Sequence, residues 1–256
     1  MALSQTLPVN QVIHGDCHDI LKRLPDQQFV QTVFVDPPYN IGIDYGSGRQ
    51  ADLLAPEEYL AGIESLIRES VCRLTQTGSL WFLCPEHWAD QVGTMLTRFL
   101  PRRNRIIWRE TFGQYHERRF PSGHRHLFWH VKDAVRSPFN TEGIRIPSRR
   151  MEAGDKCAAG PRVPDDVWEI PRLVGNARER LGDHPCQLPE ELLRRVILAS
   201  TNPGDLVLDP MAGTGTTLRV AQCLDRRYLG IEQQANYVEL IRERLKQSYQ
   251  KVLLDL

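Results

Sequence analysis

The tetrapeptide Asp36-Pro37-Pro38-Tyr39 combines residue types that can handle an amino group on a planar ring. It follows the largely apolar run 29–35 and would stand at the exposed end of a buried strand, where open α/β sheets bind their ligands. Because proline has no N–H group, both prolines fix the turn and leave bare carbonyl acceptors. The Asp36 carboxylate and the Pro37 carbonyl would accept the hydrogens of an NH2 group, while the Tyr39 ring would stack on the base. The plainer alternative is a strand that ends in a Pro-Pro turn.

A second segment, 205–217, reads as a strand, a glycine turn and the start of a helix. Gly213 and Gly215 would let the backbone turn tightly beside a ligand. The run is not a Walker loop, because no Lys follows the glycines. Glu232 ends the next predicted strand roughly 20 residues later, where folds of this kind bind a ribose hydroxyl. The pattern predicts an adenosine site; dinucleotide binding and a purely structural glycine turn are the alternatives.

With these two segments, the chain resembles the DNA amino-methyltransferases, in particular the group often called beta, in which the catalytic tetrapeptide precedes the glycine turn. Three further segments carry the resemblance: 12–17, 78–83 and 184–190. Two positions depart from the common pattern of the family, because Leu188 stands where Lys is common and Met211 where Phe is usual. The first departure removes a Lys contact to the methionine end of the cofactor, and the second is a tolerable change of volume.

The resemblance implies a fold, a cofactor, a substrate and a set of site residues. The cofactor would be S-adenosyl-L-methionine and the substrate double-stranded DNA. The implied catalytic residues are Asp36, Pro37, Pro38 and Tyr39. The implied cofactor-binding residues are Asp16, Cys17, Asp36, His184, Asp209, Pro210, Gly213, Thr214, Gly215, Thr216, Thr217 and Glu232.

The expected reaction is direct methyl transfer to the exocyclic N6 amine of an adenine that has swung out of the duplex. Members of the family that act on N4 of cytosine more often begin the tetrapeptide with Ser, so Asp36 favours adenine. Cytosine N4 and, less favoured, an RNA substrate remain alternatives. A protein methyltransferase is disfavoured by the many basic residues of the segment 98–150, and a non-catalytic relic by the intact Asp36, Tyr39, Asp209 and Glu232.

The predicted elements alternate as a parallel-rich sheet requires. Strands are expected near 11–15, 29–35, 78–84, 104–109, 126–132, 205–209 and 227–231, and helices near 17–24, 56–74, 86–99, 188–201, 215–224 and 234–250. The glycine-turn strand comes late, which predicts a circularly permuted Rossmann-like α/β methyltransferase sheet with helices on both faces. The expected organisation is a catalytic part (1–133), a small irregular target-recognition insertion (134–183) and a cofactor-binding part (184–256).

Charge is unevenly distributed although the formal net charge is zero. Residues 98–150 hold thirteen Arg and Lys against four Asp and Glu, and a localised basic surface is typical of phosphate binding. A solvated face with ordinary core aromatics is the alternative for individual residues. The predicted DNA-binding residues are Arg102, Arg103, Arg105, Arg118, Arg119, Arg125, Arg145, Arg149 and Arg150.

Two segments are expected to be irregular. The region 134–183 breaks the α/β alternation, and its small size suggests a short target sequence or help from a second subunit in a homodimer. The loop 41–55, which contains three glycines, would close over the extruded base.

Other functions are excluded or disfavoured. Pro185-Cys186-Gln187 matches the tripeptide of cytosine-C5 methyltransferases, but it precedes a predicted helix. C5 chemistry would also give no role to the tetrapeptide 36–39. The six cysteines show no CxxC spacing, so reduced thiols and no metal site are expected. Neither a signal peptide nor an 18-residue apolar run occurs, so no membrane partner and a cytoplasmic location are expected.

Overall fold

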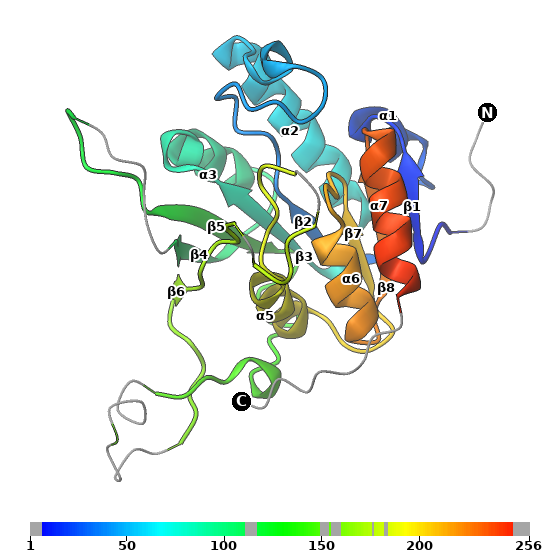
Figure 1. The fold of residues 1–256 in the computed structure, drawn as a ribbon. Helices are drawn as coiled ribbons and strands as arrows, with labels where there is room; N and C mark the ends of the chain where they lie inside the picture. Colours follow the sequence, from blue (N-terminus) through cyan, green and yellow to red (C-terminus); the bar gives the residue numbers. More distant parts are fainter. Residues whose placement is uncertain are drawn as a thin grey trace.

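The computed structural model describes residues 7–110, 117–148, 154, 160–175, 177–181 and 184–247. Its described strands form one eight-stranded sheet in the order β1-β8-β7-β2-β3-β5-β4-β6 (Figure 1). The strands are β1 Gln11–His14, β2 Val30–Val35, β3 Leu74–Cys84, β4 Arg102–Arg109, β5 His124–Val131, β6 Val167–Glu169, β7 Leu206–Asp209 and β8 Arg227–Glu232. Strands β1, β8, β7, β2 and β3 run parallel, whereas β5 is antiparallel to both β3 and β4.

Helices cover both faces of the sheet (Figure 1). One layer holds α1 Cys17–Arg23, α2 Pro56–Arg73 and α3 Ala89–Thr97, and the other holds α5 Glu190–Ser200, α6 Thr216–Cys223 and α7 Ala235–Lys246. Short 3-10 turns occur at η1 Arg49–Asp52, η2 Glu86–Trp88 and η3 Glu142–Ile144. The alternation of side chains along each strand separates two cores. In β3, Trp81 and Leu83 join the α5–α7 core, while Leu80 and Phe82 join the α1–α3 core.

The predicted permutation is confirmed by the sheet order. The glycine-turn strand β7 lies between β8 and β2, and β1, the first strand of the chain, completes the cofactor side by pairing with β8. Val30–Val35 is buried at every position, as expected of a central strand covered on both faces. The carboxyl ends of β1, β8, β7 and β2 therefore meet at one edge of the sheet.

Several predicted boundaries were wrong. The expected helix 86–99 is a 3-10 turn followed by α3, because the backbone leaves Pro85 extended and turns at Trp88 before the α-helix begins. Strand β3 begins at Leu74, four residues before Gly78, with an irregularity in its pairing to β2. Helix α7 is described to Lys246, and the last residues of the predicted 234–250 helix lie outside the described residues.

Strand β6 was not predicted, because three residues carry too little periodicity to be recognised. It lies inside the 134–183 region and extends the sheet by pairing with β4. The division of the chain into three parts remains a prediction. In the described part of the chain no helix is long and apolar enough to cross a membrane, and no cluster of side chains there could hold a metal ion.

Candidate active site

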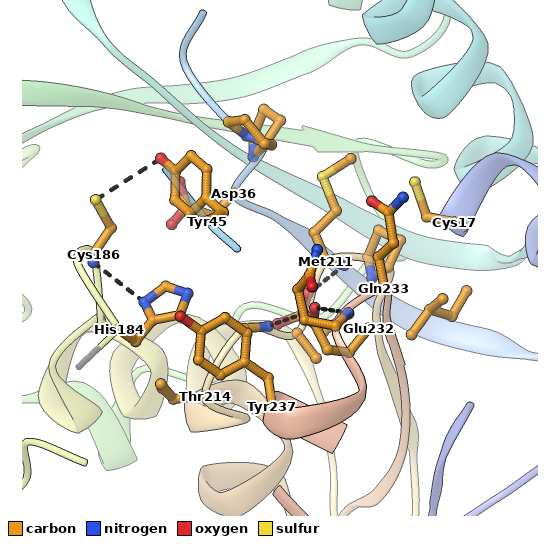
Figure 2. A pocket seen from close by; sticks show the side chains of 18 of the residues that line it. Cys17, Asp36, Tyr45, His184, Cys186, Met211, Thr214, Glu232, Gln233 and Tyr237 are labelled. Carbon is orange, nitrogen blue, oxygen red and sulfur yellow. Dashed lines mark hydrogen bonds between the residues drawn. The ribbon is translucent and has the colours of Figure 1, made fainter. Parts of the chain in front are cut away.

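A cavity of about 240 Å³ lies at the carboxyl edge of the four cofactor-side strands. Asp16, Asp36, Asp209 and Glu232 all line it, and each comes at or just after the end of a different strand. Parallel strands place these acids together because their carboxyl ends share one edge of the sheet. Figure 2 shows the cavity with Asp36 on one side and Glu232 with Thr214 on the other.

The glycine turn between β7 and α6 forms the floor of this cavity. Gly213 and Gly215 have φ angles of 53° and 75°, in the left-handed region that favours glycine. A Cβ atom on Gly213 would lie 3.1 Å from the ring of His184, so only glycine leaves the space open. The Gly213 amide donates to the Glu232 carboxylate at 2.8 Å, which ties the turn to the end of β8. Thr214 and Thr216 are buried, and both accept from Arg244 at 3.1 Å.

Three aromatic side chains form another part of the cavity wall. The rings of His184 and Tyr237 lie 4.8 Å apart, edge to face, and Tyr45 approaches His184 from the other side (Figure 2). Burial lowers the pKa of His184 to about 4, so this ring is neutral near pH 7. Tyr45 and Tyr237 were missed from sequence, since neither lies next to a recognisable motif.

Asp16 and Cys17 also line the cavity, and their predicted contact with the cofactor stays a prediction. The Asp16 carboxylate also begins α1 by accepting the amides of His18 and Asp19 at 2.9 and 3.1 Å. Burial raises the pKa of the Cys17 thiol to about 12, so it is an uncharged wall residue.

The tetrapeptide is held by hydrogen bonds from two elements. The Tyr39 hydroxyl donates to the Asp36 carboxylate at 2.8 Å, and Tyr59 donates to the Pro38 carbonyl at 3.0 Å. Trp88 donates to the Tyr39 carbonyl at 3.0 Å. Among the described residues no donor contacts the Pro37 carbonyl, so it and the second Asp36 oxygen can accept from a ligand. Burial raises the pKa of Asp36 to about 6.

A second, larger cleft of about 680 Å³ opens on the other side of Asp36 and Tyr39. Arg125 lines it, with its guanidinium 4.6 Å from the centre of the Tyr39 ring and 2.9 Å from the buried Glu110 carboxylate. Arg125 was predicted to face DNA as part of a basic surface. It is instead three-quarters buried and paired within the cleft. Glu110 was missed, because its place beside Arg125 depends on the register of β4 against β5, which the sequence does not reveal.

The other predicted arginines do not form one surface. Arg103 donates to the carbonyls of Ala134, Ser137 and Pro138 and lies over Trp129, which is a structural role. Arg105 donates to His126, and Arg145 pairs with Glu142. Arg102, Arg118 and Arg119 are exposed, and Arg119 lines the second cleft. Arg149 and Arg150 lie outside the described residues.

The loop 41–55 is folded around one buried carboxylate. Asp52 accepts the amides of Asn40, Ile41 and Ile43 at 2.7–3.2 Å. The tip of the loop reaches the cofactor-side cavity, where Ser47 accepts a hydrogen bond from the side chain of Gln234 at 2.7 Å. Its predicted closure over an extruded base remains a prediction.

The fold and the site together define a Rossmann-like α/β protein of the methyltransferase class, with a first cavity at the carboxyl ends of the parallel strands and a second cleft beside Asp36. The family model described as "DNA methylase", for N6- and N4-specific enzymes, matches residues 30–243. The chain belongs to this family, the S-adenosylmethionine-dependent DNA amino-methyltransferases.

Two relatives have similar sequences over most of the chain. The DNA adenine methyltransferase YhdJ of Escherichia coli (strain K12) is 32% identical over 244 residues, which cover 91% of this chain and 82% of the relative. The type II methyltransferase M.BglII of Bacillus subtilis is 31% identical over 259 residues, which cover 91% of this chain and 68% of the relative.

Solved structures share the fold. The PvuII DNA methyltransferase (cytosine-N4-specific) superposes with a TM-score of 0.71 at 18% identity and covers 95% of this chain and 88% of its own. The M1.HpyAVI–SAM complex superposes with a TM-score of 0.65 at 22% identity and covers 93% of this chain and 99% of its own.

The residues of the first cavity fit S-adenosylmethionine. The glycine turn leaves open the space that a Cβ atom would fill, and Glu232 offers acceptors for ribose hydroxyls. The rings of Tyr45, His184 and Tyr237 and the thioether of Met211 line the walls. The cavity also reaches Asp36 and the Pro37–Tyr39 turn, so the predicted catalytic residues and all of the predicted cofactor residues except Gly215 line one space. Gly215 instead faces α7, where a Cβ atom would lie 2.9 Å from the Ile241 side chain.

Proposed function

We propose that this DNA amino-methyltransferase acts on the N6 amine of adenine. The observation that carries the proposal is Asp36, a carboxylate that accepts a hydrogen bond from Tyr39 at one oxygen and lines both the first cavity and the second cleft. Asp in this position favours adenine within the family, and the relative YhdJ is an adenine methyltransferase.

The proposed chemistry depends on hydrogen-bond acceptors. The extruded base would enter the second cleft, where Asp36 and the Pro37 carbonyl accept the two amine hydrogens and the Tyr39 ring packs on the base. These bonds draw the nitrogen lone pair out of conjugation with the ring and aim it at the first cavity. S-adenosylmethionine supplies there a methyl group on a positively charged sulfur. As the N–C bond forms and the C–S bond breaks, one amine proton leaves through Asp36.

The cofactor would be held by the predicted set that lines the first cavity, with Glu232 on the ribose and the glycine turn beside the methionine end. Tyr45, Tyr237 and Gln234 are added to that set from the structure. A cytoplasmic location and a homodimer remain predictions, because a DNA substrate is compatible with other locations and with a monomer.

Nucleoside mass spectrometry tests the proposal. The protein is incubated with S-adenosylmethionine and mixed-sequence duplex DNA, and the digested nucleosides are analysed. N6-methyladenine is the expected product. N4-methylcytosine would overturn the choice of base, and C5-methylcytosine would overturn the amine chemistry itself. The same incubation with RNA separates the remaining alternative, since RNA should stay unmethylated.

A further inference from the structure

Phe120 is the most exposed large apolar side chain of the described residues, with 96% of its surface open to solvent. It lies in the connection between β4 and β5, and the described part of that connection, 117–123, projects away from the sheet (Figure 1). A hydrogen bond of 2.9 Å from the Glu110 amide to the Gly123 carbonyl closes the base of this connection. Exposure of a single apolar residue is common and carries no meaning alone, so the surroundings of the ring decide its role.

Those surroundings place Phe120 at the rim of the second cleft. The residues on either side of it, Arg119 and Pro121, both line the cleft that also contains Tyr39 and Asp36. Arg118 and Arg119 are exposed and positively charged, which suits the phosphates that flank a nucleotide. The ring of Phe120 therefore stands in solvent next to basic side chains, beside the entrance through which a target base would pass.

We propose that Phe120 inserts into the base stack of duplex DNA and fills the gap that the extruded target base leaves. The proposal rests on the proposed function, because it requires the base to leave the duplex for the second cleft. Extrusion costs stacking energy, and an apolar side chain that enters the stack replaces part of that energy. The neighbouring arginines hold the backbone while the ring enters.

The test compares substrates that do and do not need extrusion. The first substrate is a short, fully paired duplex with the sequence that the wild type methylates. The second substrate is the same duplex with an abasic site opposite the target base, so that the target base is already unpaired. With Phe120→Ala, methylation of the paired duplex should slow about 10- to 100-fold, and methylation of the abasic duplex should stay within about threefold of wild type. Phe120→Leu should keep most of the activity on both duplexes. Val135→Ala is the matched control, because Val135 is 91% exposed in another loop.

Two results would overturn the proposal. Unchanged methylation of the paired duplex by Phe120→Ala would mean that the ring has no part in extrusion. An equal reduction on both duplexes, together with a changed oligomeric state in light scattering, would assign Phe120 to a subunit contact. Neither result contradicts the proposed function, methylation of adenine N6. That function is contradicted only if the wild-type protein forms no N6-methyladenine in DNA.

Discussion

Asp36 is a half-buried carboxylate whose neighbours have opposite effects on its pKa. Burial raises its pKa to about 6, the Tyr39 hydrogen bond and the Arg125 guanidinium lower it, and Glu110 raises it. Near pH 7 the group is therefore ionised but is a stronger proton acceptor than an ordinary Asp. A carboxylate of this kind suits an amine that must lose a proton as it is methylated.

Replacing Asp36 should separate chemistry from cofactor binding. Asp36→Ala should abolish methyl transfer and leave the S-adenosylmethionine Kd within about tenfold of wild type, because the carboxylate acts mainly on the amine. Calorimetry measures the affinity and a radiolabelled methyl group the activity. Loss of affinity along with activity would make Asp36 a cofactor residue.

The same position should show a conflict between function and stability. Because the folded pKa of about 6 lies above the ordinary Asp value of 3.8, the folded state loses stability as the pH rises from about 4 to 6, and the loss is complete above that range. Asp36→Asn removes the buried charge, so at pH 8 it should raise the free energy of unfolding by up to about 3 kcal/mol. Urea unfolding at pH 8 and pH 5 measures the difference, which should shrink markedly at the lower pH.

Arg125 and Glu110 should shift the pH dependence of the reaction in opposite directions. Arg125→Gln removes a charge that lowers the pKa of Asp36, so the acid limb of kcat/KM should move to higher pH. Glu110→Gln removes a charge that raises this pKa, so the limb should move to lower pH. Arg125→Lys keeps the charge and should restore the wild-type profile. Parallel shifts in the two glutamine variants would show that the pair acts only through packing.

Cys186 tests the excluded C5 chemistry. Burial raises the pKa of its thiol, and the Tyr45 hydroxyl contacts the sulfur at 3.8 Å, so the group is a neutral part of the wall. Cys186→Ala should keep substantial activity. A folded variant with normal cofactor affinity and no activity would make the thiol a nucleophile.

At the scale of elements, the sequence predicts the strand ends far better than the loops. Asp36, Asp209 and Glu232 could be placed together because each comes at or just after the end of a buried strand and parallel strands share an edge. The pairing of Glu110 with Arg125 depends on the register of β4 against β5, which no local pattern determines. For the same reason Tyr45 and Tyr237, which come from a loop and a helix, could not be assigned to the cofactor pocket in advance.

Asp52 should connect the stability of the loop 41–55 with cofactor affinity. Asp52→Ala leaves three loop amides without their acceptor, at a cost of about 1–3 kcal/mol for each group that stays buried. Because the loop tip contacts Gln234, the S-adenosylmethionine Kd should rise about tenfold or more. Asp133→Ala is the control, because Asp133 also accepts loop amides, those of Val135 and Arg136, but does not line the first cavity. Equal affinity in both variants would exclude a role of the loop core in cofactor binding.

At the scale of the whole molecule, the neutral net charge conceals an uneven distribution of charge along the sheet. The cofactor cavity lies among β1, β8, β7 and β2, while the basic segment 98–150 forms the β5-β4 end. The structure reduces the number of arginines available there, because Arg103, Arg125 and Arg145 are engaged within the protein. The exposed pair Arg118 and Arg119, beside the second cleft, is the part of the predicted basic surface best placed for DNA.

Neutralising that pair should weaken DNA binding for every sequence. Removing one phosphate contact should reduce the slope of log K against log salt concentration by about 0.9 for duplex DNA, so Arg118→Gln with Arg119→Gln should lower it by up to about 1.8. Arg23→Gln with Arg242→Gln is the matched control, because these exposed arginines lie on α1 and α7 at the opposite end of the sheet. Fluorescence anisotropy at several salt concentrations measures the slopes, and the cofactor Kd should stay unchanged. A wild-type slope in the first variant would place the DNA path elsewhere, and weaker binding confined to one sequence would mean that the pair reads bases instead of phosphates.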